Sequence, residues 1–412
     1  MRNLRWRVWH FKNKSTAKDK ETYGFKSRAS PPQDVDLIPF ESDLLLMIRS
    51  IQFRQVENEF QKELQEKIRD INKDQKVYVP ADKTRNFYKI KDCTYKKALM
   101  ENITKIYKKD DRSTVDQINS EAKNIAKEME LDDRIDKYKE SQARVTIKDH
   151  KVGFLQKPTY RLINPASTQM GIISRKILAK VNFEVRSKIG VNQWTSTQDT
   201  LKWFKGLDNK NQRYFLKMDI TSFYPSITEK LLVETLEFIS EHSNLSEKEK
   251  RIIMHSRKTL LFNGDEVWVK KNGKPLFDVA MGSMDGAEIA EAVGLLILFR
   301  LGKIMNAKEV GLYRDDLLAA IAGSKSAIER LKKRIIALFK EMDLKIDIAT
   351  IIAKKVDYLG VFQTEVRHNI TIHGRLCALL FSSDEPNNDG FTLGYVFLPF
   401  LCVPLCEIFA SW

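Results

Sequence analysis

The sequence of 412 residues contains little cysteine and little histidine. Four cysteines are too few for a disulfide framework, so we expect a reducing compartment. The six histidines are scattered, and none has the spacing of a zinc site. The sequence has no internal repeat, which argues against solenoids and propellers.

The sequence also lacks a long uninterrupted apolar run. Residues 1–14 are basic and aromatic without an apolar core, which argues against a secretory signal. They suit either an amphipathic targeting segment or a basic arm that binds nucleic acid. Residues 390–406 are uncharged and largely apolar, but they are short for a membrane span and are interrupted by Pro399 and Pro404. A membrane-associated protein is therefore the lesser interpretation.

Basic residues are abundant. The chain has 70 Lys and Arg against 55 Asp and Glu, a net charge of +15, with 42% hydrophobic residues. That apolar content supports a folded core and excludes a disordered tail protein. The basic surplus predicts a polyanionic partner, nucleic acid before a membrane surface. Residues 376–412 contain four acidic residues and neither Lys nor Arg, so the surplus belongs to the rest of the chain.

The pattern along the chain predicts an α+β protein. Residues 28–35 are polar with two prolines, as in a linker. Beyond residue 144, short β-rich runs alternate with longer helical ones. Apolar positions between 328 and 342 predict a helix that ends at 344–348, and 354–362 follows it.

A first candidate for chemistry lies in residues 215–227. An apolar run there predicts a buried strand that ends in Asp219, where an apolar strand would not select a carboxylate. Ser226 and Glu229 have the spacing of a capping box, which predicts the start of the next helix. Taken alone, an aspartate at a strand end is more often a helix cap than a catalytic group.

A second candidate lies in residues 309–323. Apolar residues on both sides of a short polar segment predict a strand, a tight turn and a second strand, with Asp315 and Asp316 at the tip. Two adjacent carboxylates repel each other unless a cation compensates them, and Mg²⁺ prefers such oxygen ligands. Together with Asp219 they could hold two ions about 4 Å apart, the arrangement for in-line phosphoryl transfer.

The order of these motifs resembles reverse transcriptases. Residues 313–316 (Tyr-Arg-Asp-Asp) are similar to motif C, residues 219–227 to motif A, and 280–297 to motif B. Residues 80–83 (Pro-Ala-Asp-Lys) and 148–151 (Lys-Asp-His-Lys) resemble segments of the Penelope-like retroelement enzymes. The resemblance covers roughly residues 76–365.

The resemblance implies the fingers and palm of a right-hand polymerase, with an antiparallel palm sheet flanked by helices. It divides the chain into four parts: a basic N-terminal extension with helices (1–75), fingers with part of the palm (76–212), a palm with motifs A to E (213–365), and an atypical apolar tail (366–412). A thumb should follow the palm, and the tail does not resemble one. We therefore expect a truncated or mis-spliced copy.

The resemblance also implies a metal site. Asp219 and Asp315 are the expected ligands of two Mg²⁺ ions, for which Mn²⁺ could substitute. Asp316 supports them, and the backbone carbonyl of Ile220 is a further ligand. The ions would activate the primer 3′-hydroxyl and stabilise the leaving pyrophosphate.

Further residues are implied to bind the incoming nucleotide. Lys148 and Arg161 match the fingers residues that hold the triphosphate. Tyr224 occupies the position of the steric gate that excludes a 2′-hydroxyl, which favours deoxynucleotides. Gly282 would allow the template or nucleotide to approach the backbone closely. Lys345 is the candidate motif D lysine, with positions 354 and 355 as alternatives.

The function implied by the resemblance is an RNA-directed DNA polymerase of a mobile element. Its partners would be an RNA or DNA template with a primer, and dNTPs, in the nucleus or cytoplasm. The alternative is an inactive or truncated remnant that binds nucleic acid without polymerising. A family B DNA polymerase is disfavoured, because its Tyr-Gly-Asp-Thr-Asp motif is missing.

Overall fold

The computed structural model describes most of the chain up to residue 364. The described residues are 2–12, 30, 32–52, 58–73, 76–132, 140–151, 153–154, 156–166, 168–271, 273–351, 355–358 and 361–364. The expectations for the tail 366–412 and for Lys354 fall outside them.

The described part of the chain alternates helices with short strands. Its α-helices are α1 (Arg2–Lys12), α3 (Ile38–Ser50), α4 (Glu59–Lys73), α5 (Asp92–Ile106), α6 (Ser113–Glu128), α7 (Gln169–Ile189), α8 (Thr197–Lys205), α9 (Phe223–Ser226), α10 (Glu229–His242), α11 (Glu247–His255), α12 (Gly286–Leu301) and α13 (Lys325–Glu341), with short 3-10 turns η1 (Val35–Leu37), η2 (Lys210–Gln212) and η3 (Ala307–Glu309). Its strands are β1 (Lys76–Pro80), β2 (Phe87–Lys91), β3 (Tyr107–Asp110), β4 (Arg144–Ile147), β5 (Tyr160–Ile163), β6 (Asn192–Gln193), β7 (Arg213–Ile220), β8 (Leu261–Asn263), β9 (Glu266–Lys270), β10 (Val310–Tyr313), β11 (Asp316–Ala322), β12 (Ile346–Ile351), β13 (Lys355–Tyr358) and β14 (Val361–Thr364).

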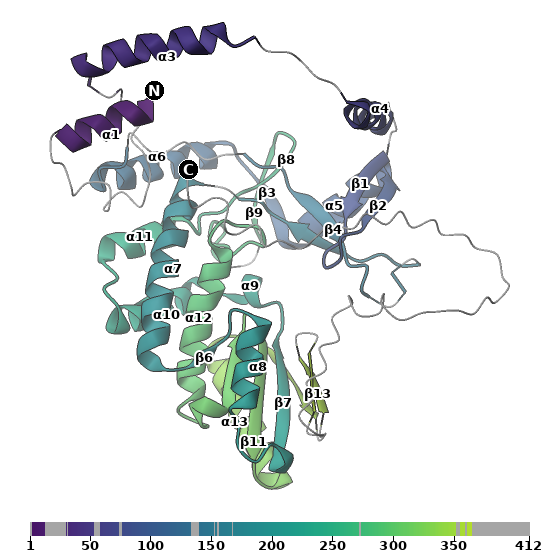
Figure 1. The fold of residues 1–412 in the computed structure, drawn as a ribbon. Helices are drawn as coiled ribbons and strands as arrows, with labels where there is room; N and C mark the ends of the chain where they lie inside the picture. The colour runs from purple at the N-terminus through teal and green to yellow at the C-terminus, as the bar shows by residue number, and fades with distance from the viewer. Residues whose placement is uncertain are drawn as a thin grey trace.

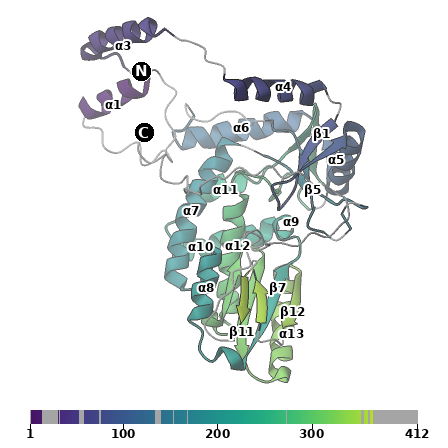
Figure 2. The same ribbon diagram turned by 45° about the vertical axis from the view of Figure 1, so that its right-hand side comes forward.

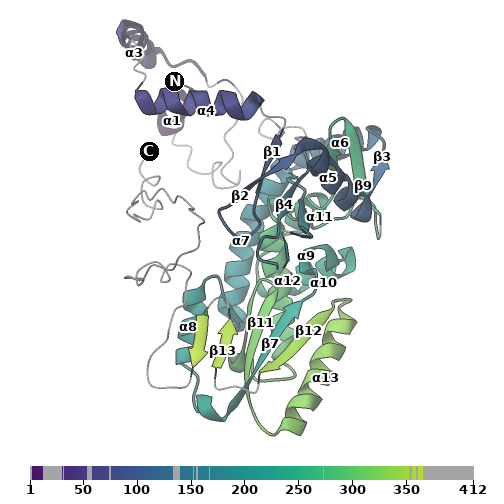
Figure 3. The same ribbon diagram turned by 90° about the vertical axis from the view of Figure 1, so that its right-hand side faces the viewer.

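A five-stranded sheet in the order β12-β7-β11-β10-β6 forms the centre of the lower part of the molecule in Figure 3. Its neighbouring strands run antiparallel except β10 and β6, which are parallel. The antiparallel sheet flanked by helices that the resemblance implied is therefore present, with one parallel pair at its edge. The predicted strand that carries Asp219 near its end and the predicted strands around Asp315–Asp316 are confirmed.

The two faces of this sheet carry different side chains because strand residues alternate. Leu216, Met218 and Ile220 of β7 point to the main core, which also contains the buried sides of α7, α10, α12 and α13. Eleven of the sixteen residues of α12 are buried there. Phe215 points to the opposite face, where it packs with Phe204 of α8 in a smaller core. Figure 3 shows α8 and α13 on the two sides of the sheet.

A second group of short sheets lies above this core (Figure 1). It contains the hairpins β1-β2 and β4-β5 and the three-stranded sheet β3-β9-β8. Strand β9 belongs to the segment expected as palm, but it pairs with β3 of the segment expected as fingers. The chain thus enters this upper part twice, once before and once after the central strand β7.

A buried ion pair joins α11 to α12. The guanidinium of Arg257, just beyond α11, binds the carboxylate of Asp285, and both side chains are 1% exposed. The hydroxyl of Ser256 donates to the same carboxylate at 2.8 Å. Asp285 directly precedes α12, so the pair fixes the start of this helix against the end of α11.

Two predicted boundaries differ in the structure. The residue that caps α10 is Thr228, whose side chain accepts from the backbone N–H of Leu231, whereas Ser226 ends the short helix α9. The helix predicted to end at 344–348 ends at Glu341, and β12 begins at Ile346. In both cases a short extra element after a turn displaced the boundary.

Among the described side chains of the N-terminal helices, none belongs to the main core. Figure 2 shows α1, α3 and α4 apart from the central sheet. Arg5 of α1 binds Glu41 of α3, and none of the α3 residues is buried. Across the residues that the structure describes, no helix is long and apolar enough to cross a membrane.

Candidate active site

Three carboxylates form one row across the central sheet, at one end of its strands. Asp219 on β7 is the direct cross-strand partner of Asp316 on β11 and of Asp347 on β12. Directly opposed residues of antiparallel strands point to the same face. The row therefore runs Asp316, Asp219, Asp347 across three strands, on the face that carries α8 further along.

Asp315 lies at the turn between β10 and β11, next to this row. Arg314 before it has a φ of +56°, a left-handed conformation that tightens the turn. The backbone carbonyl of Asp315 accepts from the N–H of Ile220 at 3.0 Å. This bond extends the pairing of β7 with β11 past the last ladder position, and it places both sequence-predicted acidic motifs side by side.

Burial and neighbouring negative charge both act on the carboxylates of this row. Burial raises the pKa of Asp219, and the charges of Asp315 and Asp347 raise it further. Burial raises the pKa of Asp316 to about 6, with added contributions from Asp315 and Asp219. Lys217 and Lys83 act in the opposite direction on the pKa of both carboxyls. Each raised pKa means that burial first, and the neighbouring negative charges second, destabilise the ionised carboxylate.

The carboxylate oxygens of this row are the ligand type that a hard divalent cation prefers, although the side chains are not drawn together around one point. Within the described ranges, no group of three or more His, Cys, Asp or Glu side chains is drawn together as a metal-binding cluster. Like charges in close proximity repel, so a set of carboxylates is not expected to close without a cation. The oxygen-rich donor set and the raised pKa values of Asp219 and Asp316 fit Mg²⁺ or Mn²⁺.

Tyr224 lies beside this row, on α9. Burial raises the pKa of its phenol, and Arg314 and Asp315 are close enough to influence that pKa in opposite directions. Its ring edge would lie 3.7 Å from a Cβ added at Gly286. Tyr224 thus sits between the start of α12 and the turn that carries Asp315.

Gly282 lies in the loop before α12, with a φ of +106°. A Cβ at this position would be 2.8 Å from the carbonyl oxygen of Asn164 and 2.9 Å from the side chain of Ile163. The N–H of Asn164 in turn donates to the carbonyl of Met281 at 2.9 Å. The close backbone approach that requires glycine here is therefore made to the chain's own β5 end.

Lys148 and Arg161 lie on one face of the β4-β5 hairpin. Arg161 is the cross-strand partner of Thr146, and the N–H of Lys148 donates to the carbonyl of Thr159 at 2.9 Å. Burial and the nearby charge of Arg161 lower the pKa of Lys148. Arg161 also forms an ion pair with Asp82 at 2.8 Å. The two predicted cations thus lie on the same face of one hairpin, and their binding of a triphosphate stays a prediction.

Lys345 is exposed and directly precedes β12. Its backbone carbonyl accepts from the N–H of Thr221 at 2.9 Å, two residues after Asp219. The lysine therefore stands at the same sheet edge as the carboxylates. Position 355 opens β13, and its side chain lies outside the described residues.

Three residues near the site were not predicted from the sequence. Asp347 was assigned to a helix end, and the alternation of Ile346, Asp347 and Ile348 was the strand signal that could have identified it. Lys83 and Asp149 were seen only as parts of longer motifs. Lys83 and Asp149 are brought together by contacts between segments about sixty residues apart, and the spacing of motifs in the sequence does not reveal such contacts.

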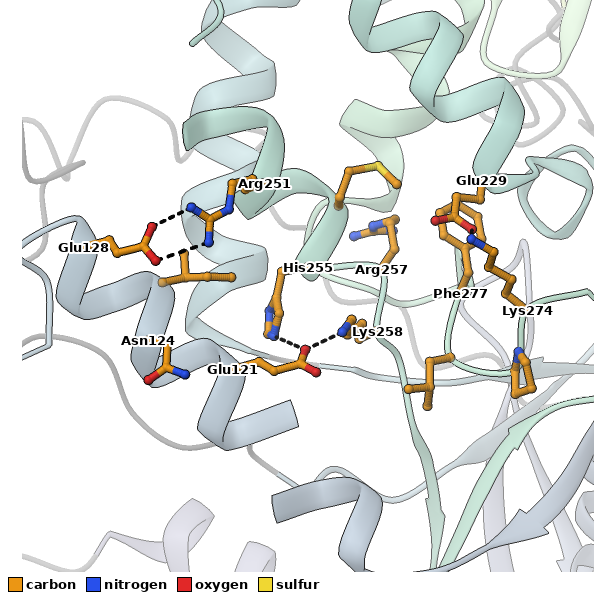
Figure 4. Close-up of a pocket in the computed structure, with 14 residues that line it drawn as sticks. Glu121, Asn124, Glu128, Glu229, Arg251, His255, Arg257, Lys258, Lys274 and Phe277 are labelled. Carbon is orange, nitrogen blue, oxygen red and sulfur yellow. Dashed lines mark hydrogen bonds and ion pairs between the residues drawn. The ribbon is translucent and has the colours of Figure 1, made fainter. Parts of the chain in front are cut away.

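A separate cavity of about 760 Å³ lies between α6, α11 and the loop after β9 (Figure 4). Its wall includes the ion pairs Glu128–Arg251 and Glu121–Lys258. His255, 7% exposed, points toward Glu121, and burial followed by the charge of Lys258 lowers the pKa of His255 to about 4. None of the predicted site residues lines this cavity.

Comparisons with known proteins support the fold. No family model matches the chain, and no curated protein matches its sequence. Among solved structures, apo telomerase from Candida tropicalis is similar with a TM-score of 0.50 and 10% identity, over 87% of this chain and 67% of that one. A form of the same telomerase truncated from its C-terminal domain gives 0.47 and 14% identity, over 69% and 61%.

The RNA-dependent RNA polymerase of a human picobirnavirus, with its insertion loop deleted, gives a TM-score of 0.41 at 12% identity, over 81% of this chain and 72% of that one. At these sequence identities the similarity concerns the fold alone, and it rests on the apo telomerase structure with its TM-score of 0.50. This chain therefore has a polymerase-like fold of mixed helices and antiparallel sheets. It spans 61% and 67% of the two telomerase chains.

Proposed function

We propose that this chain is an RNA-directed DNA polymerase of a retroelement. The observation that carries the proposal is the row of carboxylates at one sheet edge, with Asp316 directly opposite Asp219 and Asp315 at the adjoining turn. A carboxylate row of this kind, in a polymerase-like fold with a basic chain, fits nucleotidyl transfer along a polyanionic template.

Asp219, Asp315 and Asp316, with the backbone carbonyl of Ile220, are the proposed cation ligands. Two divalent ions bound there would supply the charge that favours attack by the primer 3′-hydroxyl and departure of pyrophosphate. The chain's own part is to hold oxygen ligands at the ends of rigid strands. The turn bond between Asp315 and Ile220 keeps the two motifs in register.

Lys148 and Arg161 are proposed to bind the triphosphate of the incoming nucleotide. Burial and then the charge of Arg161 lower the pKa of Lys148, and an anion between the two side chains would offset both effects. A guanidinium suits phosphate oxygens because its donors form a planar fork. Lys345 is proposed to reach the leaving pyrophosphate from the same sheet edge.

Tyr224 is proposed as the steric gate for the sugar, and Gly282 as part of the adjoining nucleotide-binding loop. Tyr224 is positioned by burial against α12 and lies next to Asp315. An aromatic ring there leaves no room for a 2′-hydroxyl, so the proposed substrates are dNTPs.

The fingers, palm and tail limits at residues 76, 212 and 365 remain part of this proposal, as does the similarity to Penelope-like elements. The expected truncation concerns residues outside the described part of the chain. The alternative function, a remnant that binds nucleic acid without polymerising, shares the basic surplus and differs in catalysis.

Primer extension on an RNA template with Mg²⁺ and dNTPs tests the proposal. Wild type should extend the primer, whereas Asp219→Ala and Asp315→Ala should abolish extension. Asp208→Ala, at an exposed aspartate in the loop before β7, is the matched control and should retain it. Tyr224→Ala should accept ribonucleotides that wild type rejects.

Absence of metal-dependent extension by wild type would exclude the polymerase. A gel shift across salt concentrations then tests the remnant, because phosphate contacts give a steep negative slope of log affinity against log salt. A flat slope would reject nucleic-acid binding as well.

A further inference from the structure

The loop of residues 82–86, between β1 and β2, is attached to the end of the β4-β5 hairpin. Ala81 forms a parallel bridge with Ile147, and the N–H of Asp82 donates to the carbonyl of Ile147 at 2.8 Å. The N–H of Ala81 donates to the carbonyl of Asn86 at 2.9 Å, which closes the loop. The backbone of this loop is thereby fixed beside the hairpin that carries Lys148.

The carboxylate of Asp149 fixes the same loop through side chains. One of its oxygens accepts from the hydroxyl of Thr84, from the amide of Asn86 at 3.3 Å and from the phenol of Tyr88 at 3.1 Å. These hydrogen bonds, that of Thr84 first, lower the pKa of Asp149. Two donors from the loop and one from β2, all on one carboxylate oxygen, hold the loop in a single position.

Lys83 is one of the two exposed cations of this loop, and Arg85 is the other. The charge of Lys83 reaches Asp219 and Asp316 on the central sheet, and it also reaches His150 beside Lys148. The backbone of Lys83 lies beside the hairpin, because the preceding Asp82 binds both Ile147 and Arg161 of the hairpin segment. Within the described ranges, neither Lys83 nor Lys148 forms a salt bridge.

Three cations thus lie on two segments that are joined to each other: Lys83 on the loop, and Lys148 and Arg161 on the hairpin. Arg161 is already engaged with Asp82 on the loop that bears Lys83, which ties the segments together. Positive charges held close to each other are stabilised by an anion with several oxygens, and a polyphosphate provides them.

We propose that Lys83 is a third contact of the incoming nucleotide's phosphates and that Asp149 is the residue that positions it. The inference rests on the proposed function, because it names a further residue of the same site. Lys83 contributes an ammonium to the phosphate oxygens, while Asp149 acts through the loop and touches no substrate.

Steady-state primer extension at varied dNTP concentration is the first test. Lys83→Ala should raise the KM for dNTP about tenfold or more, as expected for loss of a charge-assisted contact, with a smaller change in kcat. Lys83→Arg should restore most of the affinity. Arg85→Ala, the same charge loss on an exposed residue two positions away, is the matched control and should leave KM unchanged.

Asp149→Asn tests the positioning role. It should raise the KM in the same direction as Lys83→Ala but by less, and it should have little further effect when Lys83 is already alanine. An additive effect in the double variant would show that Asp149 acts independently of Lys83 and would overturn its assigned role.

Binding of a fluorescent dATP analogue, followed by anisotropy with the full chain, separates this inference from the proposed function. If wild type binds the analogue and Lys83→Ala weakens it while Arg85→Ala does not, the inference stands even without extension. Equal affinities for wild type and Lys83→Ala would overturn it, whether or not extension is observed. Equal losses for Lys83→Ala and Arg85→Ala would indicate general electrostatic attraction and also overturn it. A wild type that neither binds the analogue nor extends a primer would overturn both the inference and the proposed function.

Discussion

The buried ion pair between Arg257 and Asp285 offers a sharp test of how this fold is held together. We consider the replacement Arg257→Met, which puts an unbranched apolar side chain of similar length in place of the arginine and so removes the charge. The side chain of Asp285 is 1% exposed, and in the variant it keeps the hydroxyl of Ser256 as a hydrogen-bond donor. The carboxylate cannot reach water without moving the start of α12.

The expected cost is about 3–5 kcal/mol, the range for breaking a buried pair by removing one partner. Most of that cost is the desolvation of the charge left behind, and not the worth of the pair itself. A double variant, Arg257→Met with Asp285→Leu, removes both charges and should recover most of the loss. For a domain with about 5–15 kcal/mol of stability, the single change is a large fraction.

The assay is urea unfolding followed by tryptophan fluorescence. Arg251→Met is the matched control, because its pair with Glu128 has side chains 55% and 47% exposed, and such surface pairs contribute about 0–1 kcal/mol. The reasoning fails if Arg257→Met destabilises no more than Arg251→Met. It also fails if the double variant is as unstable as the sum of its two single changes.

Three further predictions concern packing, titration and capping. Gly311→Ala should lower the free energy of unfolding by about 1–3 kcal/mol, measured as a lower urea midpoint, because its Cβ would lie 2.1 Å from the indole of Trp194. Stability should fall as pH drops from about 6.5 to about 4, because burial keeps His255 neutral in the folded state; at about 1.4 kcal/mol per unit of pKa, the full loss is ~3 kcal/mol. Thr228→Ala should cost about 1 kcal/mol in urea unfolding through loss of the α10 cap, and Ser226→Ala should cost less.

Each of these has a control. Gly206→Ala, with its nearest atom 3.5 Å from the added Cβ, should leave the midpoint nearly unchanged. His255→Gln should flatten the pH dependence over the same interval, and an unaltered slope would assign it to other groups. Equal losses for Thr228→Ala and Ser226→Ala would contradict the cap seen in the structure.

The sequence predicted the elements that carry the acidic motifs, because those elements are local. The apolar run before Asp219 and the paired apolar runs around Asp315 and Asp316 each contain their own signal, and the strands formed there. Adjacency of the two motifs followed from the resemblance, and the strand register provides its geometry.

The parts that sequence reasoning missed depend on long-range pairing. Asp347 reaches the acidic row only because β12 pairs with β7, more than 120 residues earlier in the chain. The bonds of Asp149 to the loop around Thr84 join segments 65 residues apart. The boundary errors at Ser226 and at 344–348 arose because short elements follow turns there, where propensity is weak.

The pairing of β9 with β3 has a consequence for how the protein is made on the ribosome. Lys109 on β3 meets Glu266 on β9 across 157 residues of sequence. At roughly 5–20 residues per second of synthesis, β3 waits about 8–30 s for its partner. During that interval the edge of β3 and the apolar side of α5 emerge without their final neighbours. The upper part of the molecule is therefore the segment in which nascent chains most need protection from aggregation.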